Sequence, residues 1–105
     1  MKITLNIGLN TNTGGHVSSI EALTYLRFLG ELESSRLAQS ATEETLVAVV
    51  TTDQDFPSLV KLIQTLADIL KQACIAWRDE SGGGYLTGDR AAEWAPFNPE
   101  FFLEA

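Results

Sequence analysis

Apolar and polar residues alternate strictly along Lys2–Asn10, the first segment of the chain. The apolar positions are Ile3, Leu5, Ile7 and Leu9. A period of two is typical of a β-strand that buries one face and leaves the other polar. We therefore predict a strand over this segment, with Lys2, Asn6 and Asn10 on its polar face.

Two later segments repeat apolar residues at intervals of three and four, which predicts amphipathic helices. The first begins at Ser18, which forms a capping box with Glu21, and Gly30 is placed to end it. The second runs from Asp55, the expected N-cap, to about Gln72. Its apolar positions are Leu59, Leu62, Ile63, Leu66, Ile69, Leu70 and Ala73.

Four more segments predict strands. Glu33–Ala41 suits an edge strand, and the β-branched Thr45–Thr52 suits the centre of a sheet. Cys74–Arg78 and Tyr85–Thr87 are separated by glycines and predict a hairpin. The order β-α-β-β-α-β with an extra hairpin strand predicts an α+β fold, the ferredoxin-like split βαβ plan with two helices on one face. We expect the strands from Lys2 and Thr45 to be a parallel central pair.

The chain has 105 residues, 45% of them hydrophobic and 20% charged. These values predict a single domain over residues 1–105, with a core at 1–88 and a tail at 89–105. No apolar run approaches the roughly 20 residues that cross a bilayer, and the N-terminus lacks a secretory pattern. The single cysteine, Cys74, leaves no partner for an intramolecular disulfide. We expect a cytoplasmic protein.

Charge narrows the range of partners. Fourteen acidic residues against seven basic ones give a formal net charge of −7, and the basic residues are scattered singly. Nucleic acids and anionic membranes attract clustered Lys and Arg, so direct binding to either is not expected. An acidic surface attracts basic proteins instead, including proteins that themselves bind nucleic acid.

The chain carries none of the motifs that identify common enzyme classes. Walker, Rossmann, HExxH, GxSxG and EF-hand patterns are absent from the sequence, and the Gly82–Gly84 run is not followed by the Lys and helix of a P-loop. Cys74 opens a predicted strand, so we interpret it as a structural thiol rather than a nucleophile. We predict a protein that is not an enzyme and needs no cofactor.

In the predicted parallel arrangement, the loops after the first and third strands share one end of the sheet. They would bring together Asn12, Gly14, Gly15, His16, Asp53 and Asp55. Loop amides at helix N-termini suit an anion, whereas the two aspartates suit Mg²⁺. The alternative interpretation is structural: the glycines form a turn, and the aspartates cap the following helix.

The tail combines aromatic and acidic residues. Its candidate partner-binding residues are Glu93, Trp94, Phe97, Glu100, Phe101 and Phe102. Two hypotheses remain open. The tail either folds back over the sheet or the first helix as a lid on the core, or docks on a partner or on a second copy of the chain, giving a homodimer.

Three segments carry a resemblance: Arg90–Phe102 (RAAEWAPFNPEFF), the strand at Cys74–Ala76, and Ile3–Asn10 followed by Gly14 and Gly15. Together they resemble small uncharacterised proteins encoded by bacteriophages and prophages. The resemblance implies a viral origin and action in the host cytoplasm, and brings no catalytic residues. A small acidic protein of this class is expected to inhibit a host defence complex.

The favoured hypothesis is therefore a non-enzymatic protein that docks on a basic protein surface, such as a nucleic-acid-handling host defence complex. One alternative is a structural or virion-associated phage protein. Another is a small-molecule or metal-binding module at the two loops.

Overall fold

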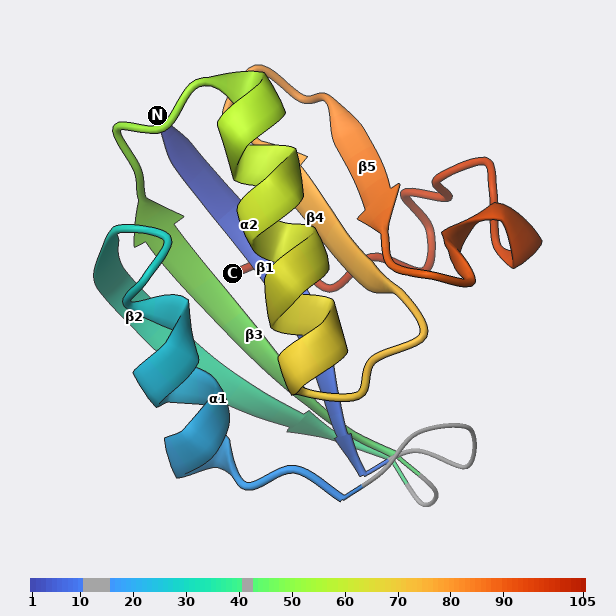
Figure 1. Ribbon diagram of the computed structural model, residues 1–105. Coiled ribbons are helices and arrows are strands. Elements are labelled where there is room, and N and C mark those ends of the chain that lie inside the picture. Colours follow the sequence, from blue (N-terminus) through green and yellow to red (C-terminus); the bar gives the residue numbers. More distant parts are fainter. Residues whose placement is uncertain (11–15, 41–42) are drawn as a thin grey trace.

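The computed structural model describes residues 1–10, 16–40 and 43–105. Its elements, in chain order, are β1 (Lys2–Asn10), α1 (Ser19–Leu26), β2 (Glu31–Gln39), β3 (Glu44–Thr51), α2 (Phe56–Ile69), β4 (Ile75–Asp79), β5 (Gly84–Thr87) and the short 3₁₀ helix η1 (Ala91–Glu93). The predicted helices and strands are all present, so the α+β class is confirmed (Figure 1). Predicted boundaries differ from these by one to three residues in most elements, because helix and strand ends are weakly encoded.

The five strands form one antiparallel sheet in the order β2-β3-β1-β4-β5. This order differs from that of a simple split βαβ, since β5 adds a strand at one edge. The prediction of a parallel central pair is wrong. β1 and β3 are neighbours at the centre, but Lys2 lies opposite Thr51 and Gly8 lies opposite Thr45, so they are antiparallel. The crossover through α1 makes β2 parallel to β1, and the β2–β3 connection then reverses the chain.

Both helices begin where the sequence places their caps. The Ser18 hydroxyl accepts a hydrogen bond from the amide of Glu21 at 3.1 Å, and Asp55 accepts one from the amide of Ser58 at 2.8 Å. Each cap satisfies an amide that has no partner within its own helix. Helix α1 ends at Leu26, earlier than predicted. Gly30 is needed for a different reason: a Cβ there would overlap with the Thr51 carbonyl of β3.

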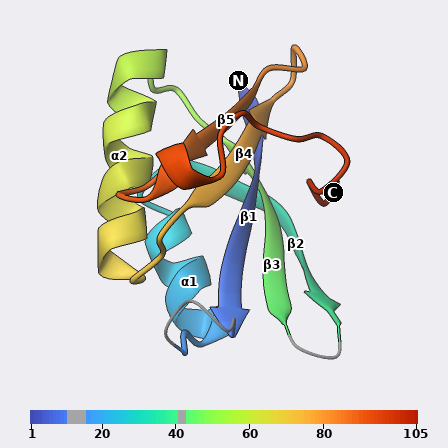
Figure 2. The ribbon, with the colours of Figure 1, turned by 90° about the vertical axis from the view of Figure 1, so that its right-hand side faces the viewer.

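The two helices cover one face of the sheet and form the main core with it (Figure 2). Core positions on the two central strands are Ile3, Leu5, Ile7, Leu9, Leu46, Ala48 and Val50. From α2, Leu59, Ile63 and Leu66 are buried and Leu62 is half-buried, as their spacing predicted. Ile69 is the exception, because it lies at the end of the helix with 44% of its surface exposed.

The β4–β5 turn is organised by Asp79. Its carboxylate accepts hydrogen bonds from the amides of Ser81 and Gly83 and from the hydroxyls of Ser81 and Tyr85, at 2.8–3.0 Å. The bond from the Ser81 hydroxyl is the main reason that the pKa of Asp79 lies below its usual value. The bond to Asp79 raises the pKa of Tyr85. Hydrogen bonds to the charged carboxylate thus fix the hairpin that ends the sheet.

In the described part of the chain, no helix has both the length and the apolar character needed to cross a membrane.

Candidate functional site: the pocket between tail and sheet

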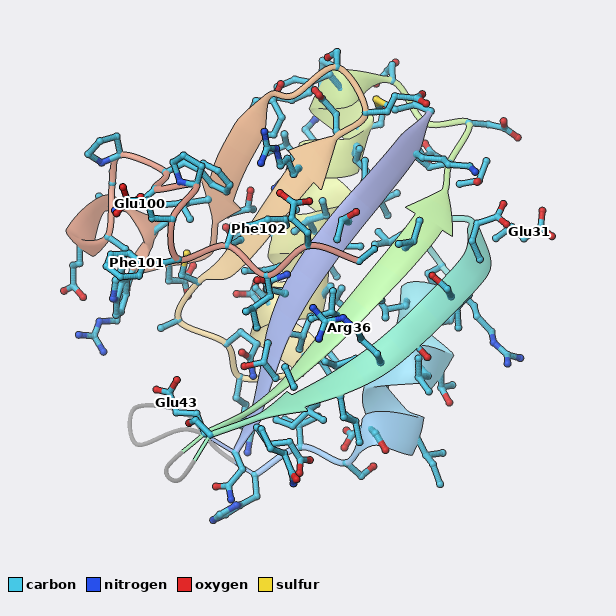
Figure 3. The ribbon with its side chains drawn as sticks, turned by 180° about the vertical axis from the view of Figure 1, so that it is seen from behind. Glu31, Arg36, Glu43, Glu100, Phe101 and Phe102 are labelled. Carbon is cyan, nitrogen blue, oxygen red and sulfur yellow. The ribbon has the colours of Figure 1, made fainter. Side chains whose placement is uncertain are left out.

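The tail, residues 89–105, begins at the β5 edge on the side of α2, where Gln64 donates a hydrogen bond to Asp89 at 3.0 Å, and its end crosses the face of the sheet opposite the helices (Figures 2 and 3). Phe102 is its main apolar anchor, with only 7% of its surface exposed. The Phe97 ring packs against the Phe102 ring with centroids 5.4 Å apart, and a side chain at Gly84 of β5 would overlap with Phe97. Val47 of β3 points to the same face as Asn6 and is also buried. Phe97 and Phe102 thus behave as the lid hypothesis predicts.

Polar groups complete the attachment. The Asn6 side chain of β1 donates to the Leu103 carbonyl and accepts from the Leu103 amide, both at 2.9 Å, as a neighbouring strand would do. Arg36 of β2 donates to the carbonyl of Glu104. Arg78 of β4 forms an ion pair with the Glu104 carboxylate at 2.6 Å. Three strands therefore hold the last residues of the tail.

Other aromatic residues of the tail are exposed rather than buried. Phe101 is 81% exposed and Trp94 is 45% exposed, although Phe102 beside them is buried. Figure 3 shows Phe102 over the sheet and Phe101 to the side of it, next to η1. Glu93 and Glu100 are exposed close to these rings in sequence. The six tail residues predicted to bind a partner are therefore divided, with two phenylalanines inside and two rings and two carboxylates outside.

Arg90 organises the start of the tail. Its guanidinium lies 5.3 Å from the centroid of the Trp94 ring and forms an ion pair with Glu93 at 2.7 Å. A guanidinium over an indole is a favourable cation–π arrangement. The charge of Arg90 is thus balanced by Glu93, and its position is set by Trp94.

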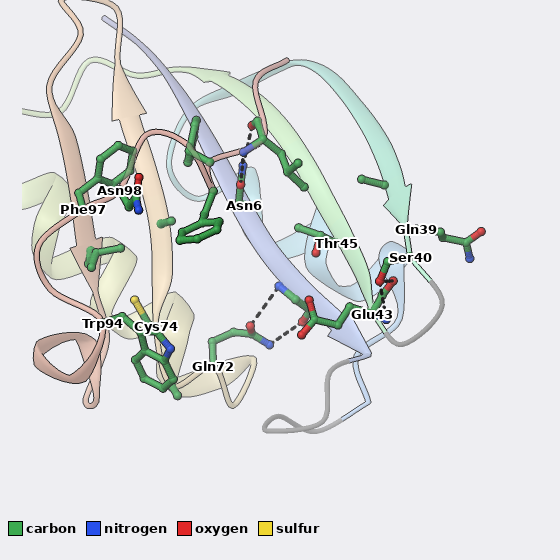
Figure 4. A pocket seen from close by; sticks show the side chains of 18 residues that line it. Asn6, Gln39, Ser40, Glu43, Thr45, Gln72, Cys74, Trp94, Phe97 and Asn98 are labelled. Atoms are coloured by element: carbon green, nitrogen blue, oxygen red, sulfur yellow. Dashed lines mark hydrogen bonds between the residues drawn. The ribbon is translucent and has the colours of Figure 1, made fainter.

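A pocket of about 550 Å³ opens between the tail and the sheet (Figure 4). Small residues line it on the sheet side, namely Gly8 of β1, Ala38 of β2 and Ala76 of β4. Trp94 and Phe101 line it on the tail side. The pocket exists because these strand positions carry too little volume to fill the space beneath the aromatic tail. The alternation in β1 places Gly8 on this face, and the lid hypothesis places the tail over the sheet or the first helix, but nothing in the sequence indicates which strand positions the tail would cover.

Polar groups define one end of the pocket. Gln72, just after α2, accepts from the Gly8 amide at 3.2 Å and donates to the Gly8 carbonyl at 2.7 Å. Glu43 lies across from it, and Figure 4 shows the carboxylate directed toward β1 and Gln72. The sequence does not single out Gln72, and the adjacent carboxylates of Glu43 and Glu44 are interpreted from the sequence as a solvated hairpin turn rather than a paired-carboxylate site. A lone glutamine after a helix and a glutamate in a hairpin turn are ordinary surface residues until topology brings them together.

Cys74 also lines the pocket and is half-buried. Burial raises the pKa of its thiol above the usual value, although a hydrogen bond from the Thr87 backbone acts in the opposite direction. A thiol with a raised pKa stays protonated at neutral pH and is a poor nucleophile. This supports our interpretation of Cys74 as a structural residue.

The predicted two-loop site is not assembled by the described residues. The amide of Val17, next to His16, bonds to the Leu9 carbonyl at the end of β1. Thr52, next to Asp53, instead bonds to Met1 at the start of β1. Because β1 and β3 are antiparallel, Val17 and Thr52 lie at opposite ends of β1, roughly 30 Å apart for a nine-residue strand.

Asp55 serves as the cap of α2, and its bonds with Ser58 lower the pKa of its carboxyl. Asn12, Gly14 and Gly15 lie outside the described residues. Within the described ranges, no three His, Cys, Asp or Glu residues are grouped so that they could hold a metal ion. The structure therefore does not bring His16 together with Asp53 and Asp55, and the tail–sheet pocket is the candidate functional site among the described residues.

Comparison with models of known protein families, with curated proteins and with solved structures found no match to this chain.

Proposed function

We propose that this protein is a non-enzymatic binding protein that docks on a basic protein surface through the outer side of its tail. The observation that supports this proposal best is the contrast between two neighbouring residues. Phe102 anchors the tail in the sheet, whereas Phe101 is held outside with 81% of its surface exposed. The tail is thus a fixed support that presents an aromatic ring to solvent.

Such an arrangement suits protein recognition for two reasons. Aromatic anchors supply much of the binding energy at interfaces, and a ring on an attached segment loses less conformational freedom on binding than one on a mobile chain. The carboxylate of Glu100 next to Phe101, together with the net charge of −7, attracts a basic partner and speeds encounter.

The proposal also covers the fold, the origin of the protein and the kind of partner. Without β5, the order of the remaining strands is β2-β3-β1-β4, which supports a ferredoxin-like core extended by one edge strand. The sequence resemblance supports a phage origin. On that basis we propose a nucleic-acid-handling host defence complex as the partner, because such complexes present the basic surfaces that an acidic inhibitor can cover.

The experiment is affinity purification of the tagged full chain from phage-infected bacteria, with quantitative mass spectrometry. The variants Phe101→Ala and Glu100→Lys change the proposed surface. Phe28→Ala and Glu21→Lys are matched controls on the opposite side of the sheet, since Phe28 is also strongly exposed. We expect the tail variants to reduce recovery of one basic partner about tenfold, which corresponds to roughly 1.4 kcal/mol, and the controls to leave recovery unchanged.

Salt provides a second test, since added salt should weaken capture by the wild-type chain. Loss of the partner in the control variants and its retention in the tail variants would move the binding surface to α1 and refute the proposal. Recovery of particle proteins, with no basic host protein, would support the virion-associated alternative instead.

A further inference from the structure

We infer that the tail–sheet pocket receives an arginine side chain of the basic partner. This inference rests on the proposed function and specifies which group of the partner enters the chain. Three features of the pocket support it: its charge, its aromatic wall, and the way its other polar groups are already used.

The charge of the pocket is negative. Among the described residues that line it, Glu43 carries a charged side chain, and none is Lys, Arg or His. The Glu43 carboxylate makes no ion pair with any described residue, and Figure 4 shows it directed toward the pocket. Glu43 is exposed, so water screens part of its attraction for a cation, and the aromatic wall has to supply the rest of the binding.

The aromatic wall favours a cation of a particular shape. Trp94, Phe97 and Phe101 all line the pocket, and aromatic faces attract cations. Trp94 already holds the guanidinium of Arg90 at 5.3 Å, so the indole is suited to this group. Glu93 balances the charge of Arg90, so Arg90 does not strongly repel a second cation nearby.

Two of the amide side chains that line the pocket are already engaged in hydrogen bonds to the backbone. The Asn6 side chain uses both its nitrogen and its oxygen on the backbone of Leu103, and Gln72 does the same on Gly8. Glu43 therefore provides the available charged acceptor. A planar guanidinium can stack on a ring and bond a carboxylate with two N–H groups, whereas an ammonium is more strongly hydrated and cannot stack in this way.

Other ligand classes fit less well. A nucleotide would bring phosphates into a pocket whose one charged side chain, among the described lining residues, is negative. A purely apolar guest would leave the Glu43 carboxylate without a partner from the ligand. The volume of about 550 Å³ accommodates an arginine side chain together with neighbouring atoms of the segment that carries it.

The test is an NMR titration of the ¹⁵N-labelled full chain with N-acetylarginine amide. N-acetylcitrulline amide is the neutral control of the same shape, and N-acetyllysine amide tests the choice between the two basic residues. We expect arginine to shift the indole N–H of Trp94 and the backbone amides of Glu43 and Ala76. Citrulline should bind about fivefold to tenfold more weakly, since it lacks the charge, and a charged pair or cation–π contact contributes roughly 1 kcal/mol. Lysine should also bind more weakly than arginine, since its ammonium is more strongly hydrated and cannot stack on a ring.

Two variants locate the binding. Glu43→Gln should weaken arginine binding about fivefold or more, whereas Glu21→Gln on α1 should not change it. Ala38→Phe should block the pocket without changing any charge, and an otherwise unaltered amide spectrum would show that the chain still folds. Absence of arginine-induced shifts, equal binding of citrulline, or binding that ignores both pocket variants would overturn the inference.

This outcome is distinguishable from failure of the proposed function. If partner capture depends on Phe101 and Glu100 but arginine causes no NMR shifts at the pocket, the proposed docking surface is supported and the assignment of arginine as the ligand is refuted. If arginine binds in the pocket but the tail variants do not reduce capture of the partner, the proposed docking surface is refuted.

Discussion

The two faces of the sheet are covered by different means. On the helix-covered face, aliphatic side chains such as Leu5 and Ile63 are fully buried within one continuous cluster. On the tail-covered face, Val47 and Phe102 are buried outside that cluster. The rest of the attachment is polar, through Asn6 and through Arg36 and Arg78 to Glu104.

The helix-covered face makes the larger contribution to stability, whereas the tail-covered face carries the proposed binding surface. An interlocked aliphatic core makes the large contribution to unfolding free energy, because burial of apolar surface is the main stabilising effect. A segment held by one buried ring and a few hydrogen bonds can open locally at a smaller cost. The proposed binding surface and the pocket both lie on this second face, where substitutions can change binding with little effect on the fold.

The largest expected effect is on the helix-covered face. Leu66→Ala should lower the free energy of unfolding by roughly 2–5 kcal/mol, because it removes a buried side chain and leaves a cavity. Ile69→Ala, on the same helix but 44% exposed, should lower it by less than about 1 kcal/mol. Urea denaturation measures both. Equal losses for the two variants would mean that the helix faces are assigned wrongly.

On the tail-covered face we expect a smaller loss of stability, with a clear difference between the neighbouring residues Phe102 and Phe101. Phe102→Ala should lower the free energy of unfolding by about 2–3 kcal/mol, less than a core phenylalanine because the chain end can relax around the gap. Phe101→Ala should change it by less than about 0.5 kcal/mol. Deletion of residues 96–105 should lower the melting temperature and increase aggregation, since Val47 becomes exposed. An unchanged melting temperature after that deletion would show that the tail does not stabilise the sheet.

Sequence periodicity was enough to predict the helices and strands, because each buries one face against the sheet. The alternation in β1 and the caps at Ser18 and Asp55 are local signals, and the structure confirms them. Strand direction was missed because periodicity is the same in parallel and antiparallel strands. That error alone placed His16 beside Asp53, and it shows how one wrong direction creates a false site.

The pocket could not be predicted from the sequence for a related reason. Its residues are small or ordinary in isolation: Gly8, Ala38, Ala76, Gln72 and Glu43. They form a site because the tail crosses the sheet above them, and the path of an irregular segment has no periodic signal. The sequence did single out the tail itself, since aromatic residues are rarely left in a structureless segment.

Asn6→Ala tests whether the pairing with Leu103 holds the tail. The substitution removes two hydrogen bonds to one residue, and we expect a loss of about 1–2 kcal/mol. Amide hydrogen exchange at Leu103 should become faster, while exchange in α2 should change less. Thr4→Ala on the same face of β1 is the control. Unchanged protection of Leu103 would show that Phe102 and the contacts of Glu104 fix the tail without Asn6.

Acid should weaken the hairpin that supports the tail. The folded-state pKa of Asp79 is lowered, so its hydrogen bonds stabilise the protein above the unfolded pKa of about 4, and this contribution is lost as pH falls through the lower folded value. The exposed side of the turn limits the effect to about 1 kcal/mol. Asp79→Asn should lower stability at neutral pH and flatten this part of the pH profile. If stability falls with the same slope in acid for Asp79→Asn and for the wild type, the acid effect comes from other carboxylates, such as Asp55.

The smallest effect is expected for the ion pair between Arg78 and Glu104, even though its atoms are only 2.6 Å apart. The Glu104 side chain is 61% exposed, so water and salt screen the attraction, and ordering two long side chains offsets part of the gain. A double-mutant cycle with Arg78→Met and Glu104→Gln should therefore give a coupling energy below about 0.5 kcal/mol. Glu104→Gln leaves the backbone carbonyl that Arg36 binds in place, so the cycle isolates the carboxylate. A coupling well above 1 kcal/mol, or release of the tail in high salt, would mean that charge rather than Phe102 and Asn6 attaches the tail to the sheet.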